Sequence, residues 1–275
     1  MDAYLTATRY TLIEQARNRF ALGLLVVFLP VWYFLMGAAI ARGPAAFKLT
    51  ATGQFLTVDA HDVTVLTAGA SAIALICGFT IFAATRKGAA FDRRLVLCGL
   101  SQPLMLAAKL TALAGVALAI STYAVFVLVV FWRPENIALV WLGYFLVALV
   151  YGTFGLLLGV LVRSELTGFF LIIMVGMLDT FFQIPVENPA GNQPFLRLFP
   201  AHGPQQLAVA GGFAGRLPFS MLLLSLAWVA GFGLVGLLIF WLRTRAWNRR
   251  TGAQLIGASV QYTRNGSRPR RAACP

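Results

Sequence analysis

Long runs of apolar residues, separated by short polar connections, follow one another along most of the chain. A run of about 20 apolar residues is long enough to cross the hydrocarbon core of a bilayer as a helix. Such runs predict six transmembrane helices, at residues 20–41, 64–84, 104–131, 137–162, 167–184 and 218–242. We therefore expect an all-α polytopic membrane protein whose transmembrane domain covers residues 20–242.

The composition agrees with this expectation and limits what the chain can do alone. Hydrophobic residues fill 59% of the 275 positions and charged residues only 11%, whereas a soluble protein carries about 25% charged residues. The two tails and five connections are each shorter than the roughly 50 residues of a small domain. A nucleotide-binding or hydrolytic domain would therefore have to come from another polypeptide.

The distribution of basic residues predicts the orientation. Most of the 22 Lys and Arg residues fall in the two tails and in the second and fourth connections. The opposite connections hold only Arg42, Lys48, Arg133, Arg197 and Arg216. Because basic residues collect on the cytoplasmic side, we expect both termini in the cytoplasm and a multi-pass protein of a bacterial inner (cytoplasmic) membrane. Anionic lipids would meet this basic face, so the net charge of +13 requires no nucleic acid.

The two tails are expected to differ in structure. Residues 1–19 place Leu5, Leu12 and Ile13 at helical spacing with charged residues between them, which predicts a cytoplasmic interfacial helix. An ordinary tail before the first span is the alternative. Residues 243–275 are basic and rich in arginine, and we expect a disordered cytoplasmic tail.

Two outer connections carry signals of local structure. The outer loop 185–217 mixes prolines and glycines with apolar side chains, which predicts short re-entrant helices before the last span, one of them near 204–210. In the segment 47–58, apolar Phe47, Leu49 and Ala51 alternate with other residues ahead of Thr52-Gly53, which weakly indicates a small hairpin. Close helix packing is expected at Gly152, Gly155 and Gly159 in the fourth span and at Gly231, Gly233 and Gly236 in the sixth.

The cytoplasmic connection 85–103 is a candidate docking segment for another protein. It has a basic start, then a short apolar helix, and then a Gly, Ser and Pro stop in which Ser101 could cap the next helix and Pro103 suits its first turn. The alternative is that this connection is only a positively charged membrane anchor that binds no partner protein. The candidate coupling residues are Phe91, Asp92, Arg93, Arg94, Leu95, Val96, Leu97 and Leu100.

Little inside the predicted spans could drive chemistry. Lys109 and Asp179 are the only charged residues there, whereas proton- or sodium-coupled transport normally needs several buried acidic or histidine groups. The sequence has no His-Glu-x-x-His motif and no phosphate-binding loop. Because Cys77, Cys98 and Cys274 fall in a span, a cytoplasmic connection and the tail, we expect no disulfide and no metal site.

Asp179, in the fifth span, has two interpretations. Together with Phe181 and Phe182 it is a candidate for a substrate path or an interface between subunits. Alternatively, its carboxylate lies close enough to the outer surface to stay hydrated.

Taken together, the six spans, the interfacial entry helix, the basic second cytoplasmic connection and the broken segment before the last span resemble the type-2 exporter permeases of ABC transporters. Residues 93–104, followed by Ala108-Lys109-Leu110, are similar to that family's coupling helix running into its third span. Residues 198–211 are similar to its outer helical hairpin. One departure is that Thr85-Arg86-Lys87-Gly88 stands where the family often has a Glu-rich start.

The resemblance implies a permease subunit that is not itself an enzyme. A second copy, or a related permease, would complete the pathway, and cytoplasmic ABC ATPase subunits would bind ATP and Mg. This chain would hold no cofactor. The implied cargo is a hydrophobic or amphipathic compound, with drug or antibiotic export first and lipid or glycan export next. The competing class is a membrane scaffold, an assembly factor, or a membrane enzyme with an unrecognised site.

Overall fold

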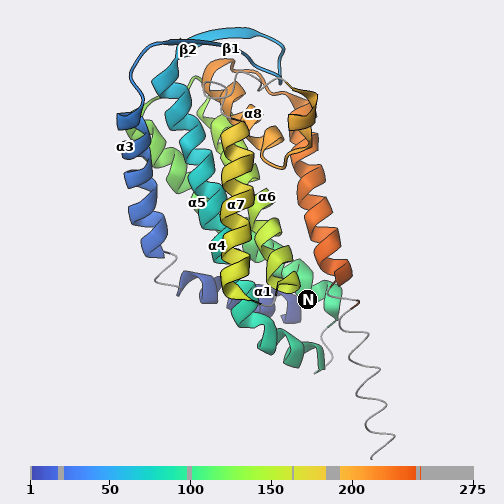
Figure 1. Cartoon of the computed structure of the whole chain (residues 1–275). Coiled ribbons are helices and arrows are strands. Elements are labelled where there is room, and N and C mark those ends of the chain that lie inside the picture. Colours follow the sequence, from blue (N-terminus) through green and yellow to red (C-terminus); the bar gives the residue numbers. More distant parts are fainter. Residues whose placement is uncertain are drawn as a thin grey trace, which may run out of the picture.

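A computed structural model describes residues 2–17, 22–97, 101–162, 164–183, 193–239 and 242. The chain is mostly helical, and its helices form a bundle that has α1 at one end and a β-hairpin at the other (Figure 1). We call these the α1 end and the hairpin end. In chain order, the elements are α1 (Asp2–Ala16), the π-helix η1 (Leu24–Phe28), α3 (Leu29–Ala39), β1 (Pro44–Lys48), β2 (Phe55–Asp59), α4 (Ala60–Leu97), α5 (Gln102–Phe131), α6 (Ile137–Leu161), α7 (Glu165–Phe182), the short 3-10 helix η2 (Pro194–Leu198) and α8 (His202–Phe213). A last helix covers Phe219–Ile239.

Each of the six predicted spans falls largely within a helix. Among the described residues, four helices are long and apolar enough to cross a membrane: Ala60–Ala89, Pro103–Phe131, Ile137–Leu161 and Phe219–Ile239. The first predicted span is represented by a shorter apolar helix, Leu25–Ala39. A helical protein with four possible membrane spans is therefore established, while the count of six and the position of the termini stay predictions.

Helix α1 confirms the helix predicted near the N-terminus. It lies across the end of the bundle (Figure 1) and packs on α5, where the hydroxyl groups of Tyr4 and Thr111 are hydrogen bonded at 2.5 Å. Leu5 and Tyr10 on the same helix are exposed. This pattern suits the membrane interface, and its position relative to a membrane stays a prediction. The predicted tail 243–275 lies outside the described residues.

The hairpin predicted around Thr52-Gly53 is also confirmed. Strands β1 and β2 pair antiparallel, with Phe47 opposite Leu56. Gly53 has φ +72°, a left-handed conformation that glycine adopts without steric cost. Beside the turn, the Ala51 N–H donates to the side-chain oxygen of Gln206 in α8 at 3.1 Å. The hairpin is therefore attached to α8.

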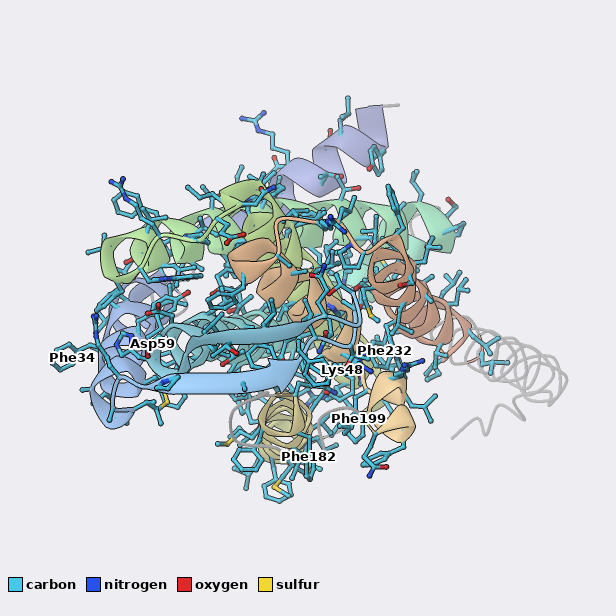
Figure 2. The ribbon with its side chains drawn as sticks, turned by 90° about the horizontal axis from the view of Figure 1, so that it is seen from above. Phe34, Lys48, Asp59, Phe182, Phe199 and Phe232 are labelled. Atoms are coloured by element: carbon cyan, nitrogen blue, oxygen red, sulfur yellow. The ribbon has the colours of Figure 1, made fainter. Side chains whose placement is uncertain are left out.

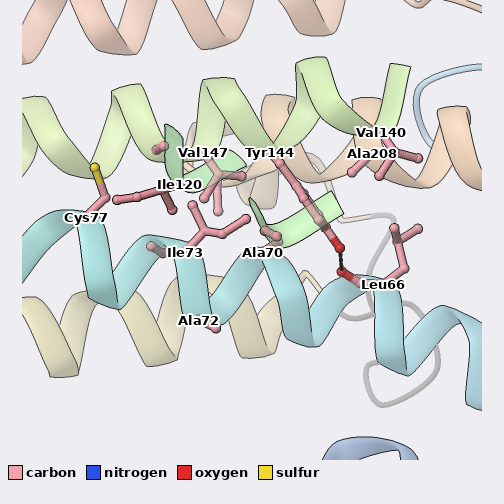
Figure 3. Packing of buried hydrophobic residues seen from close by; sticks show 14 of the residues in the cluster. Leu66, Ala70, Ala72, Ile73, Cys77, Ile120, Val140, Tyr144, Val147 and Ala208 are labelled. Carbon is pink, nitrogen blue, oxygen red and sulfur yellow. Dashed lines mark hydrogen bonds between the residues drawn. The ribbon is translucent and has the colours of Figure 1, made fainter. Parts of the chain in front are cut away.

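Helices α4 and α6 form the centre of the bundle. Ile73 of α4 faces Val147 of α6 in a fully buried layer, and Cys77 lies one turn further along α4 beside Gly152 (Figure 3). Close approach depends on small residues, because a Cβ atom at Gly155 would overlap the carbonyl oxygen of Gly78. The predicted packing role of the fourth-span glycines is confirmed.

The described residues show no close packing at two of the three sixth-span glycines. A Cβ atom at Gly231 or Gly233 would have no neighbour within 4 Å among the described residues, and one at Gly236 would make an ordinary contact with Leu156. The last helix is largely exposed within the described residues, so a packing role for these glycines stays a prediction.

Two fully buried tyrosines connect α3, α4, α5 and α6 near the hairpin end. The Tyr144 hydroxyl donates to the carbonyl oxygen of Leu66 at 2.7 Å (Figure 3). Tyr33 reaches the Tyr144 hydroxyl at 3.2 Å and the carbonyl oxygen of Ala124 at 3.3 Å. Both hydroxyl groups fit against α4 because position 69 is glycine, where a Cβ atom would overlap them.

Candidate functional site

The predicted connection between the second and third spans is largely helix. The sequence predicts a cytoplasmic connection at residues 85–103 in which a basic start precedes a short apolar helix, but α4 continues without interruption from Ala60 to Leu97. Arginine, lysine and alanine favour helix, and the single Gly88 costs only about 1 kcal/mol relative to alanine. In addition, the Arg86 guanidinium donates to the carbonyl oxygen of Val162 at 2.9 Å, which joins α4 to the end of α6.

The candidate coupling residues lie at the end of this long helix. Residues 91–97 form the last turns of α4, which extend beyond the bundle at the α1 end (Figure 1). Their side chains and the whole of Leu100 lie outside the described residues. Ser101 is the N-cap residue of α5, as predicted, although its side chain makes no capping hydrogen bond, and Pro103 lies in the first turn. The backbone alone therefore places these candidates on an extension of the central helix.

At the hairpin end, Asp179 is buried inside the bundle. It has no exposed surface, and its Oδ2 atom accepts hydrogen bonds from the Tyr151 hydroxyl at 2.6 Å and from the Ala201 N–H at 2.8 Å. The interpretation of Asp179 as a hydrated carboxylate is therefore wrong. The reason is that the chain after α7 folds back through η2 and α8, and brings the backbone of Ala201 onto the carboxylate.

One turn beyond Asp179, Gln183 connects α7 to the same returning segment. Its Nε2 atom donates to the carbonyl oxygen of Leu196 at 3.2 Å, and its Oε1 atom lies 2.8 Å from Nδ1 of His202. Because Oε1 can only accept, we assign the proton of the neutral imidazole to Nδ1 and the lone pair to Nε2. Burial, with a smaller contribution from Arg197, lowers the pKa of His202 to about 4, so the ring is neutral at pH 7.

Several buried polar atoms here have no hydrogen-bond partner among the described residues. They are Oδ1 of Asp179, Nε2 of His202, and both side-chain polar atoms of Gln205. The three residues are at most 2% exposed. We call Tyr151, Asp179, Gln183, His202 and Gln205 the polar cluster.

The structure separates Asp179 from the two aromatic residues predicted beside it. Phe181 and Phe182 are 53% and 37% exposed, respectively, while Asp179 faces inward. Instead, the ring centroids of Phe182 and Phe199 are 6.2 Å apart, and those of Phe199 and Phe195 are also 6.2 Å apart. Seen from the hairpin end, Phe182 and Phe199 occupy the same side of the bundle (Figure 2). The candidate site therefore divides into a buried polar part and an exposed aromatic part.

Of the polar cluster, only Asp179 was predicted from the sequence as a candidate site residue. Gln183 could have been found, because it follows Asp179 by four residues and so shares its helix face. Tyr151 and His202 could not, since they meet α7 only through tertiary packing. Among the described residues, no group of three or more His, Cys, Asp or Glu could hold a metal ion, and Cys77 is buried and free. Cys98 and Cys274 lie outside those residues.

Comparisons with known proteins add no assignment. No family model matches the chain, and no curated protein matches it.

Proposed function

We propose that the chain is the permease subunit of an ATP-driven exporter of the type-2 ABC class, located in a bacterial inner membrane. It would move a hydrophobic or amphipathic compound, such as a drug, an antibiotic or a lipid, out of the cell. A second permease copy or a related permease would complete the pathway. Energy would come from separate cytoplasmic ATPase subunits that dock at the α1 end.

The continuity of α4 is the observation that carries this proposal. The same helix forms the centre of the bundle and extends beyond it as the segment 91–97, in which arginines flank apolar residues. A force applied to that extension would act on the core directly, because Gly155 and Gly159 of α6 pack closely against α4. Arg86 adds a hydrogen bond from α4 to the end of α6. An ATPase bound to residues 91–97 would therefore move α4 and α6 together.

The exposed face of α7 supports the proposal that a second permease subunit packs against this helix. Apolar side chains recur there every three or four residues and form one stripe along the helix. An apolar stripe of this length can face lipid or another transmembrane helix. Its exposed members are Leu166, Phe170, Met174, Met177 and Phe181.

The test of the proposed function is reconstitution with a partner ATPase. The chain should co-purify with an ATPase subunit, and vesicles containing both should accumulate a hydrophobic dye only when ATP is supplied. Transport by the chain without an ATPase, or no association with any ATPase, would contradict the proposal.

The isolated chain is expected to hydrolyse no ATP. The sequence has no phosphate-binding loop, and no connection is long enough to form a nucleotide-binding domain. The measurement is phosphate release by the chain purified free of partners. Turnover near 1 per second, an ordinary enzymatic rate, would show that the chain contains its own catalytic site.

Replacing Asp179 with asparagine should reduce the export of cationic and neutral compounds to a similar degree. The reason is that the carboxylate is buried against Tyr151 and Ala201, where it stabilises the fold rather than contacting cargo. Uptake of a cationic and a neutral dye into inverted vesicles should be compared in the same preparation. A loss confined to the cationic dye would instead assign Asp179 to the substrate path.

A further inference from the structure

The first apolar helix, which η1 and α3 form together, changes its hydrogen-bond register partway along its length. Residues Leu24–Phe28 form a π-helix, in which a carbonyl oxygen is paired with the N–H five residues later, and the α-helical register resumes at Leu29. Pro30 lies in the first turn of the α-helical part. Prolines and π-helical turns are the usual causes of a bend in a helix, and here both fall in one short segment.

Pro30 leaves a carbonyl oxygen in the preceding turn without a main-chain donor. Because proline has no N–H group, it cannot donate to Val26, its partner in an α-helix, or to Leu25, its partner in a π-helix. The side chains of Val26 and Val27 are 54% and 63% exposed, so this turn lies on the outside of the bundle. If lipid surrounds the turn, no water reaches such a carbonyl group, and leaving it unpaired is costly.

The hydroxyl group of Tyr123 in α5 supplies a donor at this position. It donates to the carbonyl oxygen of Val26 at 3.1 Å. Val26 is the residue that position 30 would have bonded in a regular α-helix, so the tyrosine replaces the hydrogen bond that the proline removes. In membrane helices, side chains of neighbouring helices satisfy backbone groups that a proline leaves unpaired.

A second tyrosine joins the same two helices in the opposite direction. Tyr33 of α3 donates to the carbonyl oxygen of Ala124 in α5 at 3.3 Å, and its ring stacks on Phe131 with the centroids 6.0 Å apart. Val26 precedes Pro30 in the chain and Tyr33 follows it. Helix α5 is therefore bonded to the first apolar helix on both sides of the proline, and the two bonds fix the directions of the two parts.

We propose that Tyr123 is a positioning residue that sets the bend of the first apolar helix, because its hydroxyl group pairs the Val26 carbonyl oxygen that Pro30 leaves without a main-chain donor. Without this hydroxyl group, the turn before Pro30 rearranges, and the segment that precedes the proline takes other directions relative to α5. Neither an ATPase nor a second permease is part of this device. It goes beyond the proposed function and does not depend on it.

A double-mutant cycle between positions 30 and 123 tests the proposal in the full chain, unfolded reversibly in lipid nanodiscs. Tyr123→Phe removes the hydroxyl group and keeps the ring. It should lower the folding equilibrium constant about five- to tenfold, the net value of one hydrogen bond. Pro30→Ala restores an N–H group that can donate to Val26 in a regular helix. When it is present, Tyr123→Phe should lower the folding equilibrium constant by less than about twofold.

Tyr144→Phe is the matched control for this cycle. The Tyr144 hydroxyl also donates to a carbonyl oxygen of another helix, that of Leu66 at 2.7 Å. However, α4 contains no proline that would leave Leu66 without its main-chain donor. The effect of Tyr144→Phe on folding should therefore be the same with and without Pro30→Ala.

The distance between two spin labels reports the direction of the helix, which a general loss of stability would not change. The labels are attached at Leu22→Cys and Leu118→Cys, since these side chains are 45% and 52% exposed on the first apolar helix and on α5. The three native cysteines are replaced by alanine. We expect Tyr123→Phe to displace or broaden the distance distribution, and Tyr144→Phe to leave it unchanged.

Each outcome either supports or overturns the proposal. It is overturned if Tyr123→Phe leaves the label distance unchanged, or if its effect on folding is equal with and without Pro30→Ala. Should Pro30→Ala fail to fold, the label distance in Tyr123→Phe decides alone. Because no ATPase is present in these measurements, failure of ATP-driven transport in the reconstitution would contradict only the proposed function.

Discussion

Replacing both Leu95 and Leu97 with alanine is expected to abolish ATPase-dependent transport while the chain still inserts into the membrane. In the proposed complex these side chains, on the last turns of α4, bury in a cleft of the ATPase. Each fully buried leucine contributes about 1.5–3 kcal/mol, so losing both weakens association by roughly a hundredfold or more. Pull-down of the ATPase by the double variant, together with its level in the membrane, is the measurement.

A matched control for this experiment is Leu223→Ala. Leu223 lies in the last helix, outside residues 91–97 and the stripe of α7, and is 66% exposed, so its loss should leave ATPase association unchanged. Replacing Arg93 and Arg94 with glutamate should weaken association more at low than at high salt, because salt screens the repulsion. Normal binding and transport by the double leucine variant would mean that residues 91–97 are only a positively charged anchor, and the exporter proposal would lose its main support.

The positions of the helices could be predicted from sequence because their signals are local. Runs of apolar residues mark the helices, and helix ends follow from short-range chemistry, as where Asn136 accepts from the N–H of Leu139 and caps α6. The turn at Gly53 is likewise encoded by neighbouring residues. These features do not depend on how distant parts of the chain meet.

Two predictions were wrong because contacts between residues far apart in the sequence determine the structure at those places. Continuation of α4 through Gly88 is supported by the hydrogen bond from Arg86 to Val162, 76 positions away in the chain. The burial of Asp179 depends on Ala201, which reaches it only because η2 and α8 fold back onto the bundle. A pattern along one segment cannot reveal either contact.

The same distinction explains why the packing prediction for the glycines is confirmed in the fourth span and not in the sixth. Glycine in an apolar helix allows close packing, but it does not say whether a partner helix is present. Gly155 meets the backbone of α4, whereas Gly233 meets no atom of the described residues within 4 Å. Only the three-dimensional arrangement separates the two cases.

Gly155→Ala is therefore expected to destabilise the bundle strongly, and Gly233→Ala is not. The new methyl group at position 155 would overlap the carbonyl oxygen of Gly78, and relief requires the two central helices to move apart, since backbone atoms cannot rotate away. Overpacking of this kind costs about 1–3 kcal/mol. At position 233 the methyl group is unopposed, and higher helix propensity favours alanine by up to about 1 kcal/mol. Thermal unfolding of both variants in the same detergent should give a lower midpoint for Gly155→Ala and an unchanged or higher one for Gly233→Ala. Equal midpoints would show that α4 and α6 do not approach as closely as Gly155 and Gly78 indicate, and the coupled movement of these helices in transport would lose its structural basis.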